Sequence, residues 1–446
     1  MKNPIKLSDH FGYGRLLRFT LPSIAMMVFT SIYGVVDGFF VSNFAGKTAF
    51  AAVNLIMPFL MITATVGFML GTGGAAIVAR TLGEGRHEEA NRHFSLLVYV
   101  ALGVGVGIAV LSFLFIRPIS VLLGAEGQLL EDCAAYGRVN LLALPFYILQ
   151  LMFQAFFPAS EKPQLGLGVT VASGVTNMVL DAVLVPLLPA PYKLMGAAAA
   201  TALSQTVGGV VPLIYYARPN TSLLRLGKTS FSGKILLRAC VNGSSEFMSN
   251  VAMSVVSILY NWQLIRYAGE NGIAAYGVMM YVSFIFAAVF IGYSIGVGPV
   301  VSFHDGARNC AELRSLLHKS LWMNGVGGVV QLALAQLLAL PLAKLFVGYD
   351  AALMEFTVHG FRIYALSFVF MGFGIFASGF FTALNDGVTS ALISFMRTLV
   401  LEVAAVLLLP LLLGIDGVWF SIVAAQGLAM LLAAFFLVRK QPRYGY

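Results

Sequence analysis

The sequence predicts an all-α integral membrane protein with twelve transmembrane helices, arranged as two similar halves of six. Three observations support this fold class. The chain is 59% hydrophobic and only 10% charged, apolar stretches of about 20 residues recur along its whole length, and the second half repeats the first. A soluble domain needs more charge on its surface. A β-barrel would show ~10-residue alternating segments instead.

Breaks at Gly, Pro and charged residues divide the chain into twelve apolar segments. Each is long enough to cross about 30 Å of hydrocarbon as a helix. The predicted spans are 15–42, 51–79, 94–116, 134–158, 164–188, 195–217, 237–267, 274–303, 319–347, 358–383, 388–412 and 417–438. The connections between them are short, apart from the basic segment 218–234.

Lys and Arg are distributed unequally between the two sides of this predicted bundle. Twenty of the 27 lie in or beside the termini and the 2–3, 4–5, 6–7, 8–9 and 10–11 connections, with Arg397 counted in the last. The positive-inside rule therefore places both termini in the cytoplasm and the chain in the cell membrane as a multi-pass protein. The net charge of +8 does not indicate nucleic-acid binding, because the basic residues orient the protein in lipid rather than clustering on a soluble domain.

The two halves of the chain resemble each other at a shift of 223 residues. Positions 45–89 and 268–312 share 12 of 45 residues without a gap, including Gly73/Gly296 and Gly83/Gly306. We interpret this as a structural repeat. Six helices are an even number, so both halves enter the membrane from the same side as parallel repeats with the substrate path between them. The predicted domains are a first lobe at 1–217, a cytoplasmic linker at 218–236 and a second lobe at 237–446.

Four acidic residues fall inside predicted spans: Asp37, Asp181, Glu246 and Glu402. A charged carboxylate at the middle of the bilayer costs ~2.5–3.5 kcal/mol on insertion scales, so each needs a reason. A buried carboxylate either takes up a proton or binds a cation. These are the two chemistries of ion-coupled transport.

In the repeat, the two acids of the first half align with residues of the second half that are not acidic. Asp37 aligns with Tyr260, and Asp181 aligns with Ala405. Asn177 lies four residues before Asp181, on the same helical face, and Thr201 in the sixth span adds a hydroxyl. We predict that Asp37, Asn177, Asp181 and Thr201 form a site for H⁺ or a hard monovalent cation such as Na⁺.

Other polar residues inside spans are weaker candidates. Glu246 and Asn250 are four residues apart and are expected to line the cleft, with a snorkelling acid at a helix end as the alternative. Gln150 and Gln154 share a face of the fourth span, where cavity lining and interhelical hydrogen bonding are about equally expected. Glu402 has only Arg397 as a visible partner. No metal site beyond Na⁺, no organic cofactor and no nucleophile–base arrangement is indicated, so we expect no enzyme activity.

Several motifs resemble the MATE family of multidrug and toxic compound extruders, especially its MepA-like bacterial branch. They are Leu21-Pro22 followed by 36–41 (VDGFFV), Asn177-Met-Val-Leu-Asp181, 196–201 (GAAAAT) and 274–277 (AAYG). The resemblance covers nearly the whole chain. It implies a V-shaped pair of six-helix lobes that exports organic cations and other amphipathic compounds by antiport with H⁺ or Na⁺ through alternating access, as a monomer in membrane lipid. It also implies that Asp37, Asn177, Asp181 and Thr201 form the cation site of the first lobe.

One departure and two alternatives accompany this resemblance. Some relatives carry an acid after a Leu-Ser pair in the tenth span, whereas Leu366-Ser367 is followed here by Phe368. A cation site in the second lobe that depends on that acid is therefore not expected. Pro22, about four turns from Asp37, is the expected bending point of the first helix. The alternative functions are a lipid-linked saccharide flippase of the same broad superfamily, for which a cleft without basic residues is unfavourable, and an intramembrane enzyme.

Overall fold

The structure, a computed structural model, describes residues 5–41, 44, 47–189, 192–348 and 350–446. All regular secondary-structure elements of these residues are helices. In the first half they are α1 (Tyr13–Phe40), α2 (Lys47–Gly83), α3 (His87–Leu122), α4 (Gly127–Ala159), α5 (Pro163–Leu187) and α6 (Lys193–Ala217). They continue as α7 (Gly233–Gly306), α8 (Cys310–Val347), α9 (Ala351–Tyr364), the 3₁₀ turn η3 (Ala365–Ser367), α10 (Phe368–Ala383), α11 (Gly387–Phe395), the π-helical turn η4 (Met396–Val400), α12 (Leu401–Leu413) and α13 (Ile415–Tyr444).

Eleven helical segments of the described residues are long and apolar enough to cross a membrane. One of them, α7, contains 74 residues, which would measure about 110 Å if straight. It is two spans, because Gly269 has φ 61° and breaks the helical path. This break lies in the connection predicted at 268–273. Counting α7 twice gives the twelve spans that the sequence predicts, and the helices extend several residues beyond the apolar segments into the interface.

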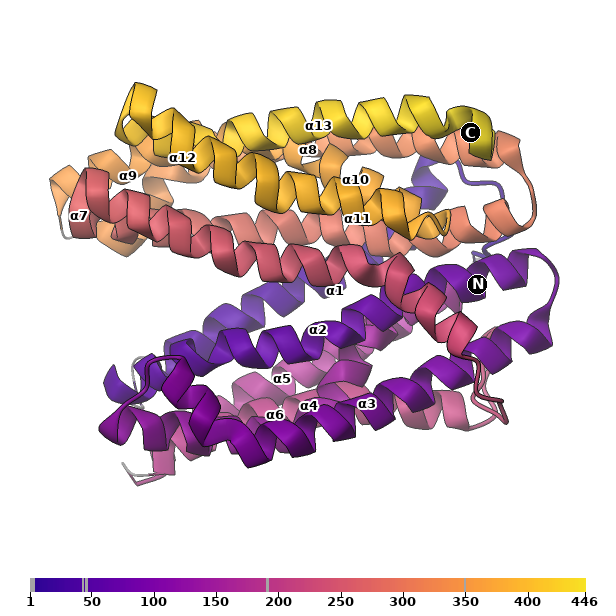
Figure 1. Ribbon diagram of the computed structural model, residues 1–446, viewed down its shortest axis with the longest axis horizontal. Helices are drawn as coiled ribbons and strands as arrows, with labels where there is room; N and C mark the ends of the chain where they lie inside the picture. Colours follow the sequence, from indigo (N-terminus) through magenta and orange to yellow (C-terminus); the bar gives the residue numbers. More distant parts are fainter. Residues whose placement is uncertain (1–4, 42–43, 45–46, 190–191, 349) are drawn as a thin grey trace.

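The helices form two lobes that lie side by side (Figure 1). One hydrophobic core gathers side chains of α2 to α6, among them Phe94, Phe153 and Phe156. Another lies among α7 to α13 and includes Tyr260, Phe368 and Trp419. α7 connects the lobes, because Ala239 near its start belongs to the first core and Tyr260 to the other. The domain boundaries at 217 and 237 stay a prediction.

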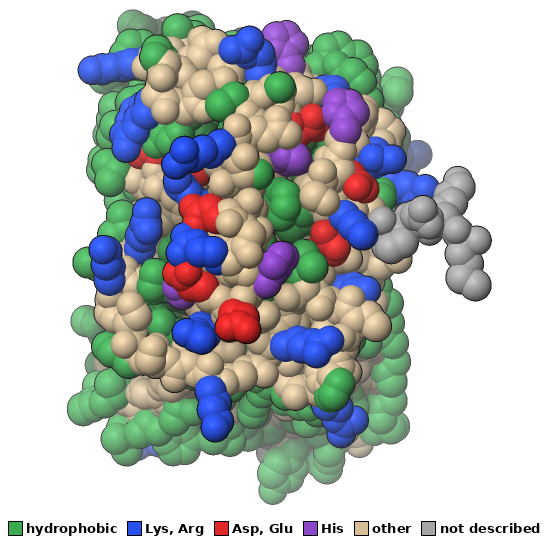
Figure 2. Space-filling model, turned by 90° about the vertical axis from the view of Figure 1, so that its right-hand side faces the viewer, with side chains coloured by type: hydrophobic (Ala, Val, Ile, Leu, Met, Phe, Trp, Pro, Cys, Tyr) green, Lys and Arg blue, Asp and Glu red, His purple; other side chains and the backbone are tan. Residues whose placement is uncertain are grey.

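The outer surface of the bundle is apolar along the helices. Leucines within the helices are largely exposed there, including Leu114 (68%), Leu337 (74%) and Leu412 (81%). Such a surface suits contact with lipid rather than water. Figure 2 views one end of the bundle, where Lys and Arg side chains are spread over the face and hydrophobic side chains cover the flanks. We call this the basic end.

The two lobes are in close contact at the basic end. A Cβ at Gly83 of α2 would overlap the carbonyl oxygen of Phe303 in α7, and a Cβ at Gly306 of α7 would overlap that of Arg80 in α2. These two glycines are aligned positions of the sequence repeat. Only glycine permits so close an approach of two backbones, so the repeat encodes a symmetric contact between the lobes.

Candidate ion and substrate sites

The four predicted cation-site residues come together in the interior of the first lobe. Asp37 lies in α1, Asn177 and Asp181 in α5, and Thr201 in α6; their exposed fractions are 8%, 2%, 0% and 8%. The Thr201 hydroxyl donates to Asp37 Oδ1 at 3.5 Å. Asp37 also interacts with the side chains of Asn177 and Asp181. The arrangement places two carboxyl groups, an amide and a hydroxyl around one point.

Several oxygen atoms of this cluster have no hydrogen-bond partner among the described residues. They are Asn177 Oδ1 and both carboxyl oxygens of Asp181. Buried polar atoms without partners are rare in native proteins, and each calls for an explanation. A shared proton or a bound cation would satisfy them.

Two tyrosines belong to this site although the sequence did not single them out. Tyr136 of α4 is fully buried and lies close enough to Asp37 and Thr201 to interact with them electrostatically, while its hydroxyl has no hydrogen-bond partner among the described residues. Tyr33, one turn before Asp37 in α1, interacts with Asp37 and Gln150. A tyrosine in a span is usually a packing residue, so only the fold identifies these two.

The corresponding region of the second lobe has no such cluster among the described residues. Tyr260, aligned with Asp37, stacks on Tyr276 with ring centroids 5.0 Å apart. Ile422, aligned with Thr201, belongs to the same hydrophobic core. Aromatic and aliphatic packing therefore replaces the polar cluster, in agreement with the asymmetry of the repeat.

A cavity of about 320 Å³ lies between the lobes. Glu246 and Asn250 of α7 line it, as does Glu402 of α12. The rest of its wall is largely apolar and rich in methionine and aromatic side chains: Met27, Phe68, Met253, Tyr276, Met280, Phe284, Tyr364 and Met371. This size and lining suit a drug-sized apolar ligand with a few polar contacts, and flexible methionines suit ligands of varied shape.

Three other predicted residues lie elsewhere. Gln150 and Gln154 are buried inside the first lobe, 4% and 1% exposed, and are not among the residues that line the cavity. Gln150 instead donates to Ser173 Oγ at 3.4 Å, which fits the interhelical alternative. Pro22 lies inside α1, which is helical from Tyr13 to Phe40. Its neighbour Ile24 packs against Gly292 of α7.

The structure corrects the expectation of a cleft without basic residues. Arg397, which was counted with the basic helix ends beside the 10–11 connection, lies in η4, where it lines the central cavity together with Glu246 and Glu402. The cavity wall therefore carries two carboxylates and one guanidinium. The inward position of the Arg397 side chain was not predicted, because the residue follows a run of uncharged residues at the start of the span. The sequence also does not show the π-helical turn in which it lies.

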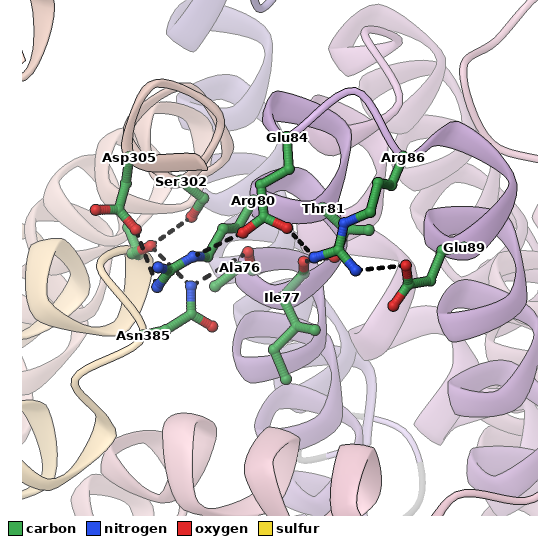
Figure 3. Close-up of polar contacts among 11 residues, drawn as sticks. Ala76, Ile77, Arg80, Thr81, Glu84, Arg86, Glu89, Ser302, Asp305 and Asn385 are labelled. Atoms are coloured by element: carbon green, nitrogen blue, oxygen red, sulfur yellow. Dashed lines mark hydrogen bonds and ion pairs between the residues drawn. The ribbon is translucent and has the colours of Figure 1, made fainter. Parts of the chain in front are cut away.

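A polar network joins the lobes at the basic end (Figure 3). Arg80 of α2 forms an ion pair with Asp305 of α7 at 3.1 Å and with Glu84 at 3.4 Å. Glu84 and Glu89 both pair with Arg86. Burial raises the pKa of the Glu84 carboxyl, but the hydrogen bonds and charges of Arg86 and Arg80 together outweigh burial and hold that pKa below its usual range.

The segment before α1 adds a second connection between the lobes. The Leu7 N–H donates to Glu161 Oε1 at 2.7 Å in the first lobe. The Phe11 N–H donates to Glu312 Oε1 at 2.9 Å in the second. The basic end is thus closed by backbone contact, ion pairs and this bridging segment.

Two repeated lobes, a central cavity and a buried polar cluster in one lobe define a membrane transporter built from parallel repeats. The MatE family profile matches residues 22–183 and 247–408, one segment in each half. The chain belongs to the MatE family.

Similar proteins cover almost the whole chain. The multidrug export protein MepA of Staphylococcus haemolyticus (strain JCSC1435) is 24% identical over 429 residues, which are 96% of this chain and 94% of that protein. MepA of Staphylococcus aureus (strain NCTC 8325 / PS 47) is 23% identical over 420 residues, 94% of this chain and 92% of that protein. A crystal structure of MATE in complex with MaL6 superposes with a TM-score of 0.92 at 22% identity, covering 100% of this chain and 99% of that one. At this identity the structural likeness concerns the fold.

Proposed function

We propose that this protein exports organic cations and other amphipathic compounds across the cell membrane by antiport with H⁺ or Na⁺. The observation that carries the proposal is the first-lobe cluster, in which Asp37 and Asp181 are buried together while the second lobe has aromatic packing at the aligned position. The names of the MepA relatives support multidrug export as the activity.

The proposed mechanism is alternating access. Two carboxyl groups that share a buried site favour binding of a proton or cation, because their mutual repulsion is then relieved. Binding of the proton or cation at this cluster and binding of substrate in the cavity would favour different relative positions of the two lobes. The two ligands would therefore compete. The Arg80–Asp305 pair and the Gly83–Gly306 contact must separate for the cavity to open at the basic end. We place that end, with both termini, on the cytoplasmic side.

The test is dye efflux in proteoliposomes with ΔpH and ΔpNa imposed separately. We expect wild-type protein to move a lipophilic cation such as ethidium against one of the two gradients. Asp37→Asn and Asp181→Asn should each abolish coupled efflux, and the double variant should be no worse than either single, because the two residues act as a unit. Asp416→Asn, which changes an acid that is 43% exposed, is the matched control and should retain coupling.

Two results would contradict the proposal. Wild-type coupled efflux in Asp37→Asn would remove the cluster from the coupling mechanism. Transport of anionic lipid-linked sugars alone, with no efflux of any dye, would favour the flippase alternative. Thermal unfolding of each variant, measured alongside, separates loss of coupling from loss of fold.

A further inference from the structure

Arg397 is a fixed positive charge in the wall of the central cavity, and no described acid contacts it directly. It forms no hydrogen bond or ion pair with any described residue, and its Nε atom is buried and unpaired. An arginine side chain stays protonated in proteins, so the guanidinium cannot relieve its desolvation by losing a proton. A buried charge that the protein itself does not pair is a candidate for pairing with a ligand.

The backbone around Arg397 positions its side chain. The residue lies in the π-helical turn η4, where the Leu401 N–H donates to the Met396 carbonyl, five residues back. A single π-helical turn interrupts the regular spacing of a helix and is found most often at functional sites. The Cδ atom of Arg397 lies only 2.7 Å from where a Cβ at Gly374 of α10 would be, so glycine at that position leaves room for the arginine side chain.

The charges near Arg397 are of opposite sign but do not touch it. Glu246 and Glu402 interact with it electrostatically, yet neither forms a direct ion pair with it. Both line the same cavity as Arg397. The wall therefore presents one cationic group capable of binding a carboxylate in a bidentate fashion, beside anionic groups capable of binding an amine.

We propose that Arg397 binds the carboxylate of amphipathic zwitterionic substrates, whose amine faces Glu246 and whose apolar body packs on the methionine and aromatic wall. This inference rests on the proposed export function and narrows its substrate class. The competing interpretation is that Arg397 serves only as an internal counter-charge for Glu402. That role would affect every substrate equally, so a matched pair of substrates separates the two.

The probes are a rhodamine dye with a free carboxyl group, which is a zwitterion, and its methyl ester, which is a cation of nearly the same shape. Binding is measured by fluorescence polarisation with purified full-length protein, and efflux in proteoliposomes. Arg397→Gln should weaken binding of the free acid about tenfold or more, the range for a lost hydrogen bond to a charged group, and leave the ester within about twofold. Arg397→Lys should recover part of the affinity for the acid, because it restores the charge without the planar fork.

Two further variants guard against loss of fold and non-specific effects. The double variant Arg397→Gln/Glu402→Gln keeps the net charge of the wall and should show the same selective loss of the acid. Arg266→Gln changes an exposed arginine of α7 that stacks on Trp262, outside the cavity, and should bind both dyes as the wild type does.

The outcomes distinguish failure of the role proposed for Arg397 from failure of the proposed export function. If wild-type protein exports neither dye, the export function itself fails. If it exports the ester but does not bind the acid, or if Arg397→Gln weakens both dyes equally, export stands and the role of Arg397 is overturned. Displacement of both dyes by a pyrophosphate-bearing lipid at lower concentration than by the free acid would also overturn it, since the occupant would then be a lipid.

Discussion

At the scale of single residues, both proposed ligand sites contain buried polar atoms that lack a hydrogen-bond partner among the described residues. Asp181 in the first lobe is 0% exposed and neither of its carboxyl oxygens has a hydrogen bond from a described residue. Arg397 in the second lobe has a buried, unpaired Nε. Leaving a buried polar group unsatisfied costs about 1–3 kcal/mol, and more for a charge. Both sites are therefore expected to gain stability when a ligand binds.

Asp386, between α10 and α11, is a half-buried acid whose two carboxyl oxygens, unlike those of Asp181, both accept hydrogen bonds. It accepts from the Thr389 N–H at 3.3 Å and from Lys440 Nζ and the Tyr444 hydroxyl at 3.0 Å each. Burial raises the pKa of this carboxyl, but the hydrogen bonds from Lys440, Thr389 and Tyr444 outweigh burial, so its pKa lies below the usual value. The charged form is thus stabilised by folding and ties α13 to α11.

We predict that Asp386→Asn lowers the unfolding free energy by about 1.5–3 kcal/mol at pH 7, the range for hydrogen bonds to a charged group. A depressed pKa contributes stability that is complete above the unfolded-state pKa of about 3.9 and is lost as the pH falls through the lower folded value. The difference between wild type and variant should therefore be constant from pH 6 to 8 and shrink below about pH 4. Thermal unfolding in detergent across this range measures it. Asp416→Asn, in an exposed pair with His359, should change stability by less than about 1 kcal/mol, and an equal loss there would refute the assignment.

At the scale of helices, the contact between α2 and the second half of α7 is the element that holds the basic end closed. The contact is symmetric, because Gly83 and Gly306 each meet a carbonyl oxygen of the other helix. Arg80, which supplies one of those oxygens, also pairs with Asp305 beside Gly306. Backbone proximity and charge pairing thus act at the same turn of both helices.

Gly83→Val is predicted to separate the lobes at the basic end while leaving each lobe folded. The added side chain overlaps the Phe303 carbonyl, and overpacking of this kind costs about 1–3 kcal/mol, which corresponds to a shift of roughly 5- to 160-fold toward the separated state. Spin labels at Arg92→Cys of α3 and Arg314→Cys of α8, both exposed, report the distance between lobes. Gly107→Val in α3, where a Cβ meets no atom within 4 Å, is the control. An unchanged distance distribution in Gly83→Val would mean that this contact does not hold the lobes together.

At the scale of the whole molecule, the sequence predicts the fold class because hydropathy and the repeat are global signals. The break in α7 illustrates this: the polar connection 268–273 indicated a turn, and Gly269 provides it with φ 61°. The helix ends were less predictable, because α3 runs from His87 to Leu122 whereas its apolar segment is 94–116. Hydrophobicity measures what lies in lipid, and a helix continues through the interface as long as its backbone hydrogen bonds are favourable.

The candidate site could be predicted from residue types that are rare in apolar spans, such as acids. It could not be predicted from residue types that are common there, such as tyrosine. Asp37 and Asp181 stand out as acids in apolar spans whose repeat partners are Tyr260 and Ala405. Tyr136 does not stand out, because tyrosine is common in helix packing and its role depends on the α1–α4–α6 arrangement. The position of the Arg397 side chain in the cavity wall was not predicted, because the residue lies in a π-helical turn that the sequence does not reveal.

The orientation of the molecule is the last prediction, and burial determines how it can be tested. The positive-inside rule places the basic end in the cytoplasm, and the exposed Cys310 lies at that end, where α8 begins shortly after Gly306. Cys133 lies in α4 towards the opposite end but is fully buried, with its thiol 3.5 Å from the Ala52 carbonyl. It is therefore not expected to react from outside, although the charge distribution alone would make it the outside reporter.

Glu126→Cys, at an exposed position just before α4, supplies that reporter in a Cys240→Ser background. A membrane-impermeant maleimide should label Glu126→Cys in intact cells and Cys310 only after permeabilisation. Labelling of Cys310 in intact cells would invert the topology, and with it the direction in which closure of the basic end controls access to the cavity.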